Sequence, residues 1–181
     1  MWTPTVIGSR GKPVTVTLLE ANHCPGAIMF LFEVGNRYIL HVGDFRWNRQ
    51  VMEAQAPLRP FFKERSITEL YLDTTYCDPK YDLPAQEAAI EETIQVAETH
   101  VKQARSRKED LLLLFGAYTI GKERIYMSVA ERLKMKVYVD RRRYRVLSAL
   151  EWSAQKMSLL TTRPEESSLV RALTRNIPIN F

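Results

Sequence analysis

A hairpin signal in residues 28–42 constrains the fold of this chain most strongly. Residues 28–32 (Ile-Met-Phe-Leu-Phe) and 38–42 (Tyr-Ile-Leu-His-Val) are apolar runs, and Gly35-Asn36 between them is a turn dipeptide. Residues 14–19 (Val-Thr-Val-Thr-Leu-Leu) have the period-two pattern of a further strand. We therefore expect these three segments to form one sheet.

Two polar residues, His23 and Asp44, each stand at an end of these strands. The hairpin returns both residues to the same end of the sheet. Pro25-Gly26 interrupts the strand pattern directly after the histidine, and Gly43 lets the backbone leave its strand just before the carboxylate. Imidazole and carboxylate suit zinc, so the pattern predicts a pair of metal ligands. The alternatives are a satisfied histidine at a strand end and an aspartate that forms a turn.

Beyond residue 80 the hydrophobic period changes from that of strands to that of a helix. A helix that begins near Pro84 has apolar residues on one face. A continuous apolar strand at 111–115, a helix at 122–133 and a strand at 137–139 follow it. Buried strands that alternate with helices imply a parallel sheet. We therefore predict an α/β chain with a domain boundary near residue 80.

Residues 116–123 (Gly-Ala-Tyr-Thr-Ile-Gly-Lys-Glu) lie between a predicted strand and a predicted helix. They match the phosphate-binding loop G-x-x-x-x-G-K-[ST] at every position except the last. Glu123 replaces the hydroxyl that would bind magnesium, which argues against an NTPase. Free N–H groups at the helix N-terminus and the ammonium of Lys122 still favour an anion. We therefore predict that this loop binds a phosphate group through Tyr118, Thr119 and Lys122.

Charge is distributed unevenly along the chain, whose net charge is +5. Residues 1–100 have 9 lysines and arginines against 13 acidic residues, whereas residues 101–181 have 17 against 8. The net charges are thus −4 and +9. The densest basic cluster predicts a surface that faces a polyanion. It consists of Arg141, Arg142, Arg143 and Arg145.

Composition excludes several classes of protein. With 45% hydrophobic residues, the chain can bury a core and is not a disordered tail. No run approaches the roughly 18 apolar residues of a membrane span, and the first residues have no signal pattern. We therefore expect a soluble, intracellular protein that does not bind membranes. Its two cysteines give no disulfide framework.

Four segments occur in the order found in one known family. They are 18–27 (Leu-Leu-Glu-Ala-Asn-His-Cys-Pro-Gly-Ala), 40–46 (Leu-His-Val-Gly-Asp-Phe-Arg), 71–77 (Tyr-Leu-Asp-Thr-Thr-Tyr-Cys) and 118–123 (Tyr-Thr-Ile-Gly-Lys-Glu). The chain resembles the β-CASP metallo-β-lactamase nucleases of DNA repair, and among them the cross-link repair 5′-exonucleases related to Artemis and Apollo.

The resemblance implies a fold and a set of site residues. Residues 1–80 would form a partial metallo-β-lactamase β-sheet. Residues 81–181 would form a β-CASP domain with a small parallel sheet and helices, incomplete at its C-terminal end. His23 and Asp44 would be zinc ligands, Asp44 and Asp73 would be catalytic, and the hydroxyl groups beside Asp73 would contact the phosphate. These hydroxyl groups belong to Thr74 and Thr75.

The family also has two motifs that this chain lacks, a His-x-His-x-Asp-His cluster and a distal histidine. The histidines of the chain are His23, His41 and His100. Because a catalytic zinc needs about three protein ligands, we expect a chain truncated at both ends that binds zinc weakly or not at all, with one or two zinc ions in the intact enzyme. We expect His41 to pack against a neighbour, to hydrogen-bond to one, or to orient the site without binding metal. His100 is expected at the surface.

The leading functional prediction is a fragment of a nuclear, zinc-dependent 5′-to-3′ DNA exonuclease. It would act on single-stranded or 5′-phosphorylated DNA in the repair of interstrand cross-links and double-strand breaks. The chain alone is expected to be inactive. One alternative is a catalytically inactive DNA-binding or scaffold fragment of the same family. Another is an RNA-processing β-CASP nuclease.

Overall fold

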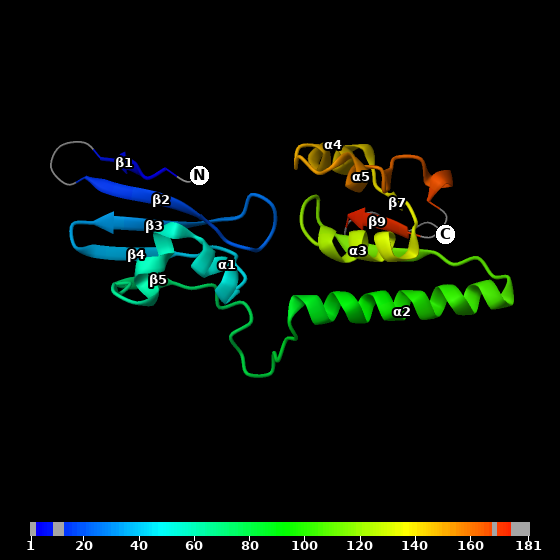
Figure 1. Cartoon of the computed structure of the whole chain (residues 1–181), viewed down its shortest axis with the longest axis horizontal. Coiled ribbons are helices and arrows are strands. Elements are labelled where there is room, and N and C mark those ends of the chain that lie inside the picture. The colour runs from blue at the N-terminus through cyan, green and yellow to red at the C-terminus, as the bar shows by residue number, and fades with distance from the viewer. Residues whose placement is uncertain (1–2, 9–12, 168–169, 175–181) are drawn as a thin grey trace. The chain divides into compact units, whose positions relative to one another are not determined.

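The computed structural model describes residues 3–8, 13–167 and 170–174. The chain divides into two compact units, Met1–Tyr81 and Asp82–Phe181 (Figure 1). Both units combine strands with helices, so the predicted α/β class is confirmed. Within the described residues, no helix is long and apolar enough to span a membrane.

Unit 1 is built on a five-stranded sheet in the order β1-β2-β3-β4-β5. The first four strands pair antiparallel, whereas β5 pairs parallel with β4. The three strands predicted from the hairpin pattern are confirmed as β2, β3 and β4. The strands are β1 (Thr5–Ile7), β2 (Val14–Glu20), β3 (Ile28–Val34), β4 (Arg37–His41) and β5 (Glu69–Tyr71).

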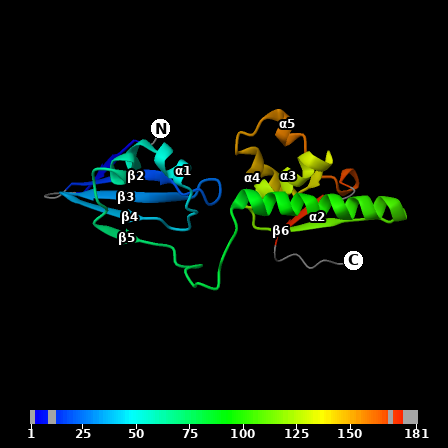
Figure 2. The same ribbon diagram turned by 60° about the horizontal axis from the view of Figure 1, so that its bottom comes forward.

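Two short helices, α1 (Arg49–Ala54) and η1 (Ala56–Phe62), cover one face of this sheet (Figure 2). Alternate residues of β2 and β3 point toward them because side chains along a strand alternate between its faces. The resulting core contains Leu19, Ala21, Met29, Leu31, Val42, Met52 and Leu58.

The side chain of Gln55 joins the end of α1 to the end of β2. The backbone N–H of Glu20 donates to Gln55 Oε1 at 2.7 Å, and Gln55 Nε2 donates to the carbonyl of Glu20 at 3.0 Å. This amide therefore satisfies both backbone groups of the last residue of β2, which leads into the loop that contains His23.

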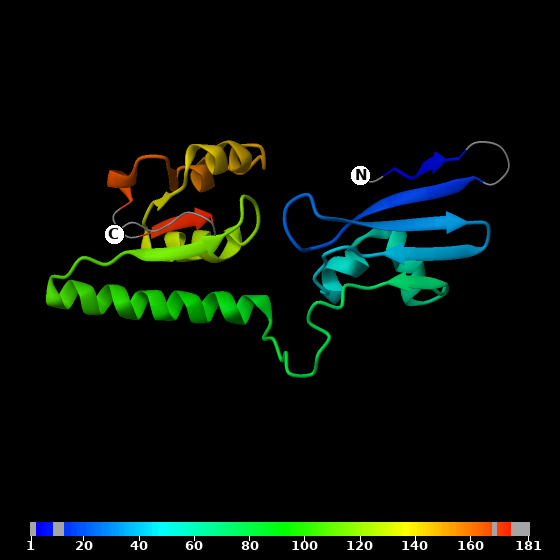
Figure 3. The same ribbon diagram turned by 180° about the vertical axis from the view of Figure 1, so that it is seen from behind.

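Unit 2 has a four-stranded sheet in the order β6-β9-β7-β8. All of its pairings are parallel, which confirms the parallel sheet predicted for this half. Figure 3 shows α2 running alongside β6. Ile90, Ile94 and Ala97 of α2 pack with Val129 of α3. The elements are α2 (Gln86–Arg107), β6 (Leu113–Ala117), α3 (Glu123–Leu133), β7 (Val137–Tyr138), α4 (Arg141–Ser148), α5 (Ala154–Met157), β8 (Leu160–Thr161), η2 (Pro164–Glu166) and β9 (Val170–Thr174).

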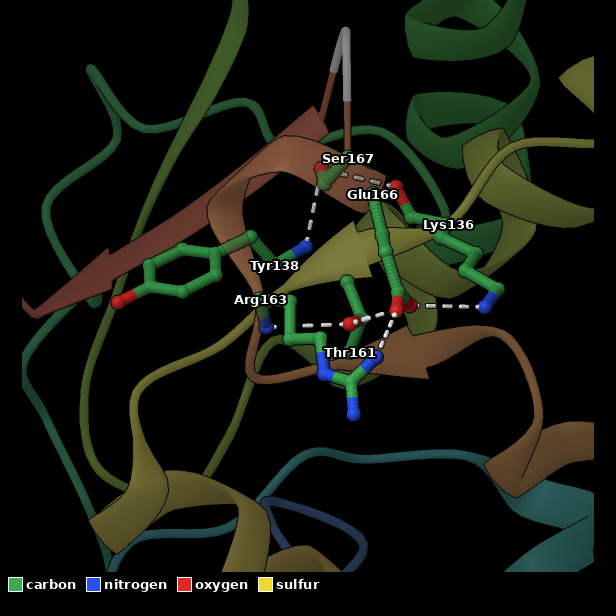
Figure 4. A network of polar contacts seen from close by, with 6 residues as sticks. All are labelled: Lys136, Tyr138, Thr161, Arg163, Glu166 and Ser167. Atoms are coloured by element: carbon green, nitrogen blue, oxygen red, sulfur yellow. Dashed lines mark hydrogen bonds and ion pairs between the residues drawn. The ribbon is translucent and has the colours of Figure 1, made fainter.

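A polar network joins β7, β8 and η2 (Figure 4). The carboxylate of Glu166 accepts hydrogen bonds from Lys136 Nζ at 3.0 Å, from the Thr161 hydroxyl at 2.9 Å and from Arg163 at 3.1 Å. The hydroxyl of Ser167 donates to the carbonyl of Lys136 at 3.0 Å. The hydrogen bonds from Lys136 and then Thr161 hold the pKa of Glu166 below its usual value of 4.5.

This network predicts an acid-sensitive contribution to stability. A lowered carboxyl pKa stabilises the folded state above the usual pKa, and the contribution disappears as the pH falls through the folded-state value. Glu166→Gln should therefore lower the melting temperature at pH 7, and the difference from the parent chain should shrink below about pH 4. Thermal melts at both pH values check this. Glu165→Gln, on the neighbouring residue, should leave the melting temperature unchanged; an equal loss in both variants would contradict the assignment.

Candidate functional site

His23 lies in the loop that follows β2, and its side chain is exposed. The loop closes on itself, because the N–H of Ala27 donates to the Cys24 carbonyl at 3.0 Å and the N–H of Ala21 donates to the Ala27 carbonyl at 3.2 Å. Gly26 has a φ of +85°, which a residue with a side chain rarely adopts. The predicted interruption between the two strands is confirmed, but β2 already ends at Glu20, three residues before His23.

Asp44 follows β4 across a sharp bend at Gly43, whose φ is +56°. The ring nitrogen Nδ1 of His41 accepts the N–H of Gly43 at 3.2 Å, so this histidine holds the bend. The His41 ring also stacks on Tyr71, with centroids 5.6 Å apart. The expectation that His41 hydrogen-bonds to a neighbour is confirmed.

Two hydrogen bonds tie the loop of His23 to the loop of Asp44. The N–H of Arg46 donates to the Ala21 carbonyl at 3.0 Å, and Asn22 Nδ2 donates to the Arg46 carbonyl at 3.2 Å. Asn22 has a φ of +54°, a left-handed conformation that asparagine tolerates better than most residues. Asn22 was not among the predicted site residues, although its position directly before His23 was a signal for it.

Asp73 follows β5 at the end of the sheet that also bears Asp44. β4 and β5 run parallel, with His41 paired to Tyr71. The residues that follow the two strands therefore lie at the same end of the sheet. Asp44 and Asp73 line one open depression, together with His41, Gly43 and residues 70–72. The structure thus places both predicted acidic residues at one depression.

The Asp73 carboxylate is held by the residue two positions along. Its Oδ1 accepts the Thr75 hydroxyl at 2.6 Å and the Thr75 N–H at 2.9 Å. These two hydrogen bonds are the largest causes of a lowered pKa of Asp73, and the charge of His23 lowers it further. Asp73 is therefore an anion near neutral pH. The side chain of Thr74 is exposed.

A metal site requires more donors than this cluster supplies. In the part of the chain that the structure describes, no three His, Cys, Asp or Glu side chains lie together so that they could hold a metal ion. His23, Asp44 and Asp73 have the donor atoms that zinc prefers, but a catalytic site needs about three protein ligands around one ion. His100 lies exposed on α2, in the other unit. These residues therefore do not form a complete zinc site by themselves.

Residues 118–122 connect β6 to α3, as predicted, but the N–H groups of this loop are not all available to an external anion. Glu123 is buried, at 6% exposure, and its Oε1 accepts the N–H of Gly121 at 2.6 Å. The expectation of free N–H groups is therefore wrong for Gly121, because a carboxylate of the chain itself occupies the place of an external anion. Lys122 is exposed, with its Nζ 5.3 Å from the ring centroid of exposed Tyr118. Thr119 is half-buried.

The basic cluster on α4 divides into two kinds of arginine. Arg141 and Arg142 are exposed, as a DNA-facing role requires. Arg143 is 1% exposed, and its guanidinium donates to the carbonyls of Ala117, at 3.0 Å, and Tyr118. The prediction that Arg143 faces DNA is therefore wrong. Successive residues of an α-helix point about 100° apart, so neighbouring arginines point in different directions, and Arg143 is the one on the packed side of α4.

Sequence comparison finds relatives among DNA cross-link repair proteins and 5′ exonucleases. The chain is 36% identical over 160 residues to the DNA cross-link repair protein pso2/snm1 of Schizosaccharomyces pombe, and the match covers 86% of the chain and 27% of that protein. It is 38% identical over 169 residues to the human DNA cross-link repair 1A protein, covering 93% of the chain and 15% of that protein. It is 36% identical over 141 residues to the chicken 5′ exonuclease Apollo, covering 78% and 28%.

The chain thus spans less than a third of the length of these relatives. No protein-family model matches it. Among solved structures, a protein of unknown function from Enterococcus faecalis superposes with a TM-score of 0.54 at 14% identity. That match covers 95% of the chain and 44% of the solved chain, and it shows a likeness of fold alone.

Proposed function

Because the chain belongs to the SNM1-type family of DNA cross-link repair proteins, which includes Apollo, we propose that it forms part of a zinc-dependent DNA nuclease that digests from the 5′ end. The observation that carries this proposal is that His23, Asp44 and Asp73 follow strands that finish at the same end of the unit 1 sheet, with Asp44 and Asp73 on one depression. Paired carboxylates beside an imidazole are the groups with which proteins hold metal ions against a phosphodiester.

Each of these residues has a role that its geometry supports. His23 and Asp44 would be metal ligands, supplemented by donors that the described residues do not supply. Asp73, kept ionised by Thr75, would shape the site and attract the metal. When bound, zinc would lower the pKa of a water molecule and neutralise charge on the phosphate. In this proposal residues 1–80 are a partial metallo-β-lactamase domain and residues 81–181 a β-CASP domain.

The proposed DNA surface lies in unit 2. Residues 101–181 have a net charge of +9, and Arg141 and Arg142 are exposed on α4. Exposed guanidinium groups contact phosphates without reading the base sequence. The proposed substrate is single-stranded or 5′-phosphorylated DNA, and the proposed setting is the repair of interstrand cross-links and double-strand breaks in the nucleus. The relatives carry DNA-repair names, which favours DNA over the RNA-processing alternative.

A second candidate function is that of a catalytically inactive DNA-binding or scaffold fragment. One observation favours it: among the described residues, no three metal-binding side chains lie close enough together to hold a metal ion. Both candidate functions require the basic surface of unit 2 to bind DNA.

The DNA surface is tested by salt dependence. Arg141→Gln with Arg142→Gln should weaken binding of a single-stranded oligonucleotide and lower the slope of log affinity against log salt by about 0.7 for each phosphate that the variant no longer neutralises. Fluorescence anisotropy titrations at several salt concentrations give this slope. Lys63→Gln removes one exposed charge from unit 1 and should leave the slope unchanged. If the double variant keeps the affinity and slope of the parent, unit 2 does not provide the DNA surface.

A further inference from the structure

The segment from Asp73 to Tyr81, which follows β5, is ordered by two consecutive turns. In the first, the Asp73 carboxylate accepts from Thr75, and the N–H of Cys77 donates to the Thr74 carbonyl at 3.2 Å. In the second, the Asp78 carboxylate accepts the Lys80 N–H at 3.0 Å. The N–H of Tyr81 then donates to the carbonyl of Asp78 at 2.9 Å. Local hydrogen bonds thus fix this segment without a helix or strand.

These turns present two tyrosine rings to solvent. The rings of Tyr76 and Tyr81 lie 5.2 Å apart in an edge-to-face arrangement with an interplanar angle of 89°. Tyr76 is 62% exposed and Tyr81 is 42% exposed. Contact between the rings limits their rotation, so the pair offers a preformed aromatic surface at a small cost in conformational entropy.

The charges around the rings favour a base over a phosphate as the ligand. Lys80 Nζ lies 4.9 Å from the Tyr81 ring centroid and 3.0 Å from an Asp78 carboxylate oxygen. The Asp78 carboxylate offsets the charge of that ammonium, so the cation nearest the rings adds little attraction for a phosphate. A flat π-system is bound through its face and not through a charge, so the rings favour a base.

The tyrosine pair follows closely in the sequence after Asp73, which lines the depression. Tyr76 stands three residues after Asp73, so their Cα atoms are at most about 11 Å apart. Stacked nucleotides rise about 3.4 Å each along a strand. A strand that passes beside the depression therefore has a base within reach of Tyr76.

We propose that Tyr76 and Tyr81 form a stacking platform for a base of single-stranded DNA that passes beside the Asp44–Asp73 depression. This inference rests on the proposed function and adds to it the chemical group that the site recognises beside the phosphate. Stacking on tyrosine tolerates every base, so the platform would hold the strand without sequence preference. Both rings and both acidic residues belong to unit 1.

The test compares a 12-nucleotide thymidine strand with an abasic strand of the same length, each titrated against the whole chain. In the parent, the thymidine strand should bind more tightly. Tyr76→Ala should weaken binding of the thymidine strand about 5- to 150-fold and leave the abasic strand unaffected, since stacking on one aromatic ring contributes that much. Tyr81→Ala should act in the same direction. Tyr76→Phe keeps the ring and should bind like the parent.

Leu83→Ala is the matched control, because Leu83 is 60% exposed just beyond the same segment but has no aromatic ring. Circular dichroism checks that each variant folds. If the parent binds both strands equally, or if Tyr76→Ala weakens both equally, the stacking platform is refuted and the rings serve another partner. If the parent binds neither strand, the proposed DNA function itself fails.

Discussion

Arg143→Ala should destabilise the folded chain by roughly 2–5 kcal/mol. The Arg143 guanidinium is buried and donates to the carbonyls of Ala117 and Tyr118, where β6 runs into the loop before α3. Truncation leaves these acceptors without a charged donor and opens a cavity in the space of a long side chain. Urea denaturation followed by circular dichroism measures the change.

Arg142→Ala on the same helix provides the control. Arg142 is exposed, so its truncation should change stability by no more than about 0.5 kcal/mol while reducing the salt dependence of DNA binding. The two neighbouring arginines thus have opposite expected effects, one on folding and one on binding. Equal stability of the two variants would refute the assignment of Arg143 as a structural residue.

The second large effect concerns catalysis. The 181-residue chain should hydrolyse 5′-phosphorylated single-stranded DNA no faster than the uncatalysed background and should bind zinc weakly, because its described residues gather no three metal ligands. Since enzymes accelerate such reactions by at least about a millionfold, the expected loss is total within the range of an assay. A gel assay with zinc, and competition against a zinc chelator, measure both properties.

Two further proteins make this result interpretable. A longer protein that joins this chain to the additional segments of its relatives should digest the same DNA, and Asp44→Ala in it should reduce the rate at least about a hundredfold. If the 181-residue chain digests DNA and loses this activity on Asp44→Ala, the inference that it has too few metal ligands is refuted. So would one tightly bound zinc ion per chain.

The sequence predicted the fold best where the decisive interactions are local. Alternation and the Gly35-Asn36 turn depend on neighbouring residues, and the strands they predicted are present as β2, β3 and β4. The short strand β1 (Thr5–Ile7) was not predicted, because three residues show little periodicity. Helix α4 was also missed, because its sequence begins with three arginines and its few apolar residues follow them.

The candidate site was likewise predicted where its position depends on neighbouring residues, and was missed where it depends on contacts between distant segments. The placement of His23 and Asp44 at strand ends follows from strand lengths and turn residues. The hydrogen bond from Asn22 to Arg46 spans 24 residues, and the one from Arg143 to Ala117 spans 26. Such contacts depend on how distant elements pack, which no local pattern encodes. The interaction of Glu123 with Gly121 spans only two residues, but whether its carboxylate is buried there depends on the surrounding core.

The parallel pairing of β4 with β5 has a consequence for how the site comes into being during folding. The hairpin of β3 and β4 closes a short loop, whereas β5 reaches its place only after residues 42–68, with α1 and η1, have crossed over. Closing the longer loop costs more chain entropy and slows the formation of contacts. We therefore expect Asp44 to take its position with the hairpin and Asp73 to join it later. The depression between them would then report that β5 has paired with β4.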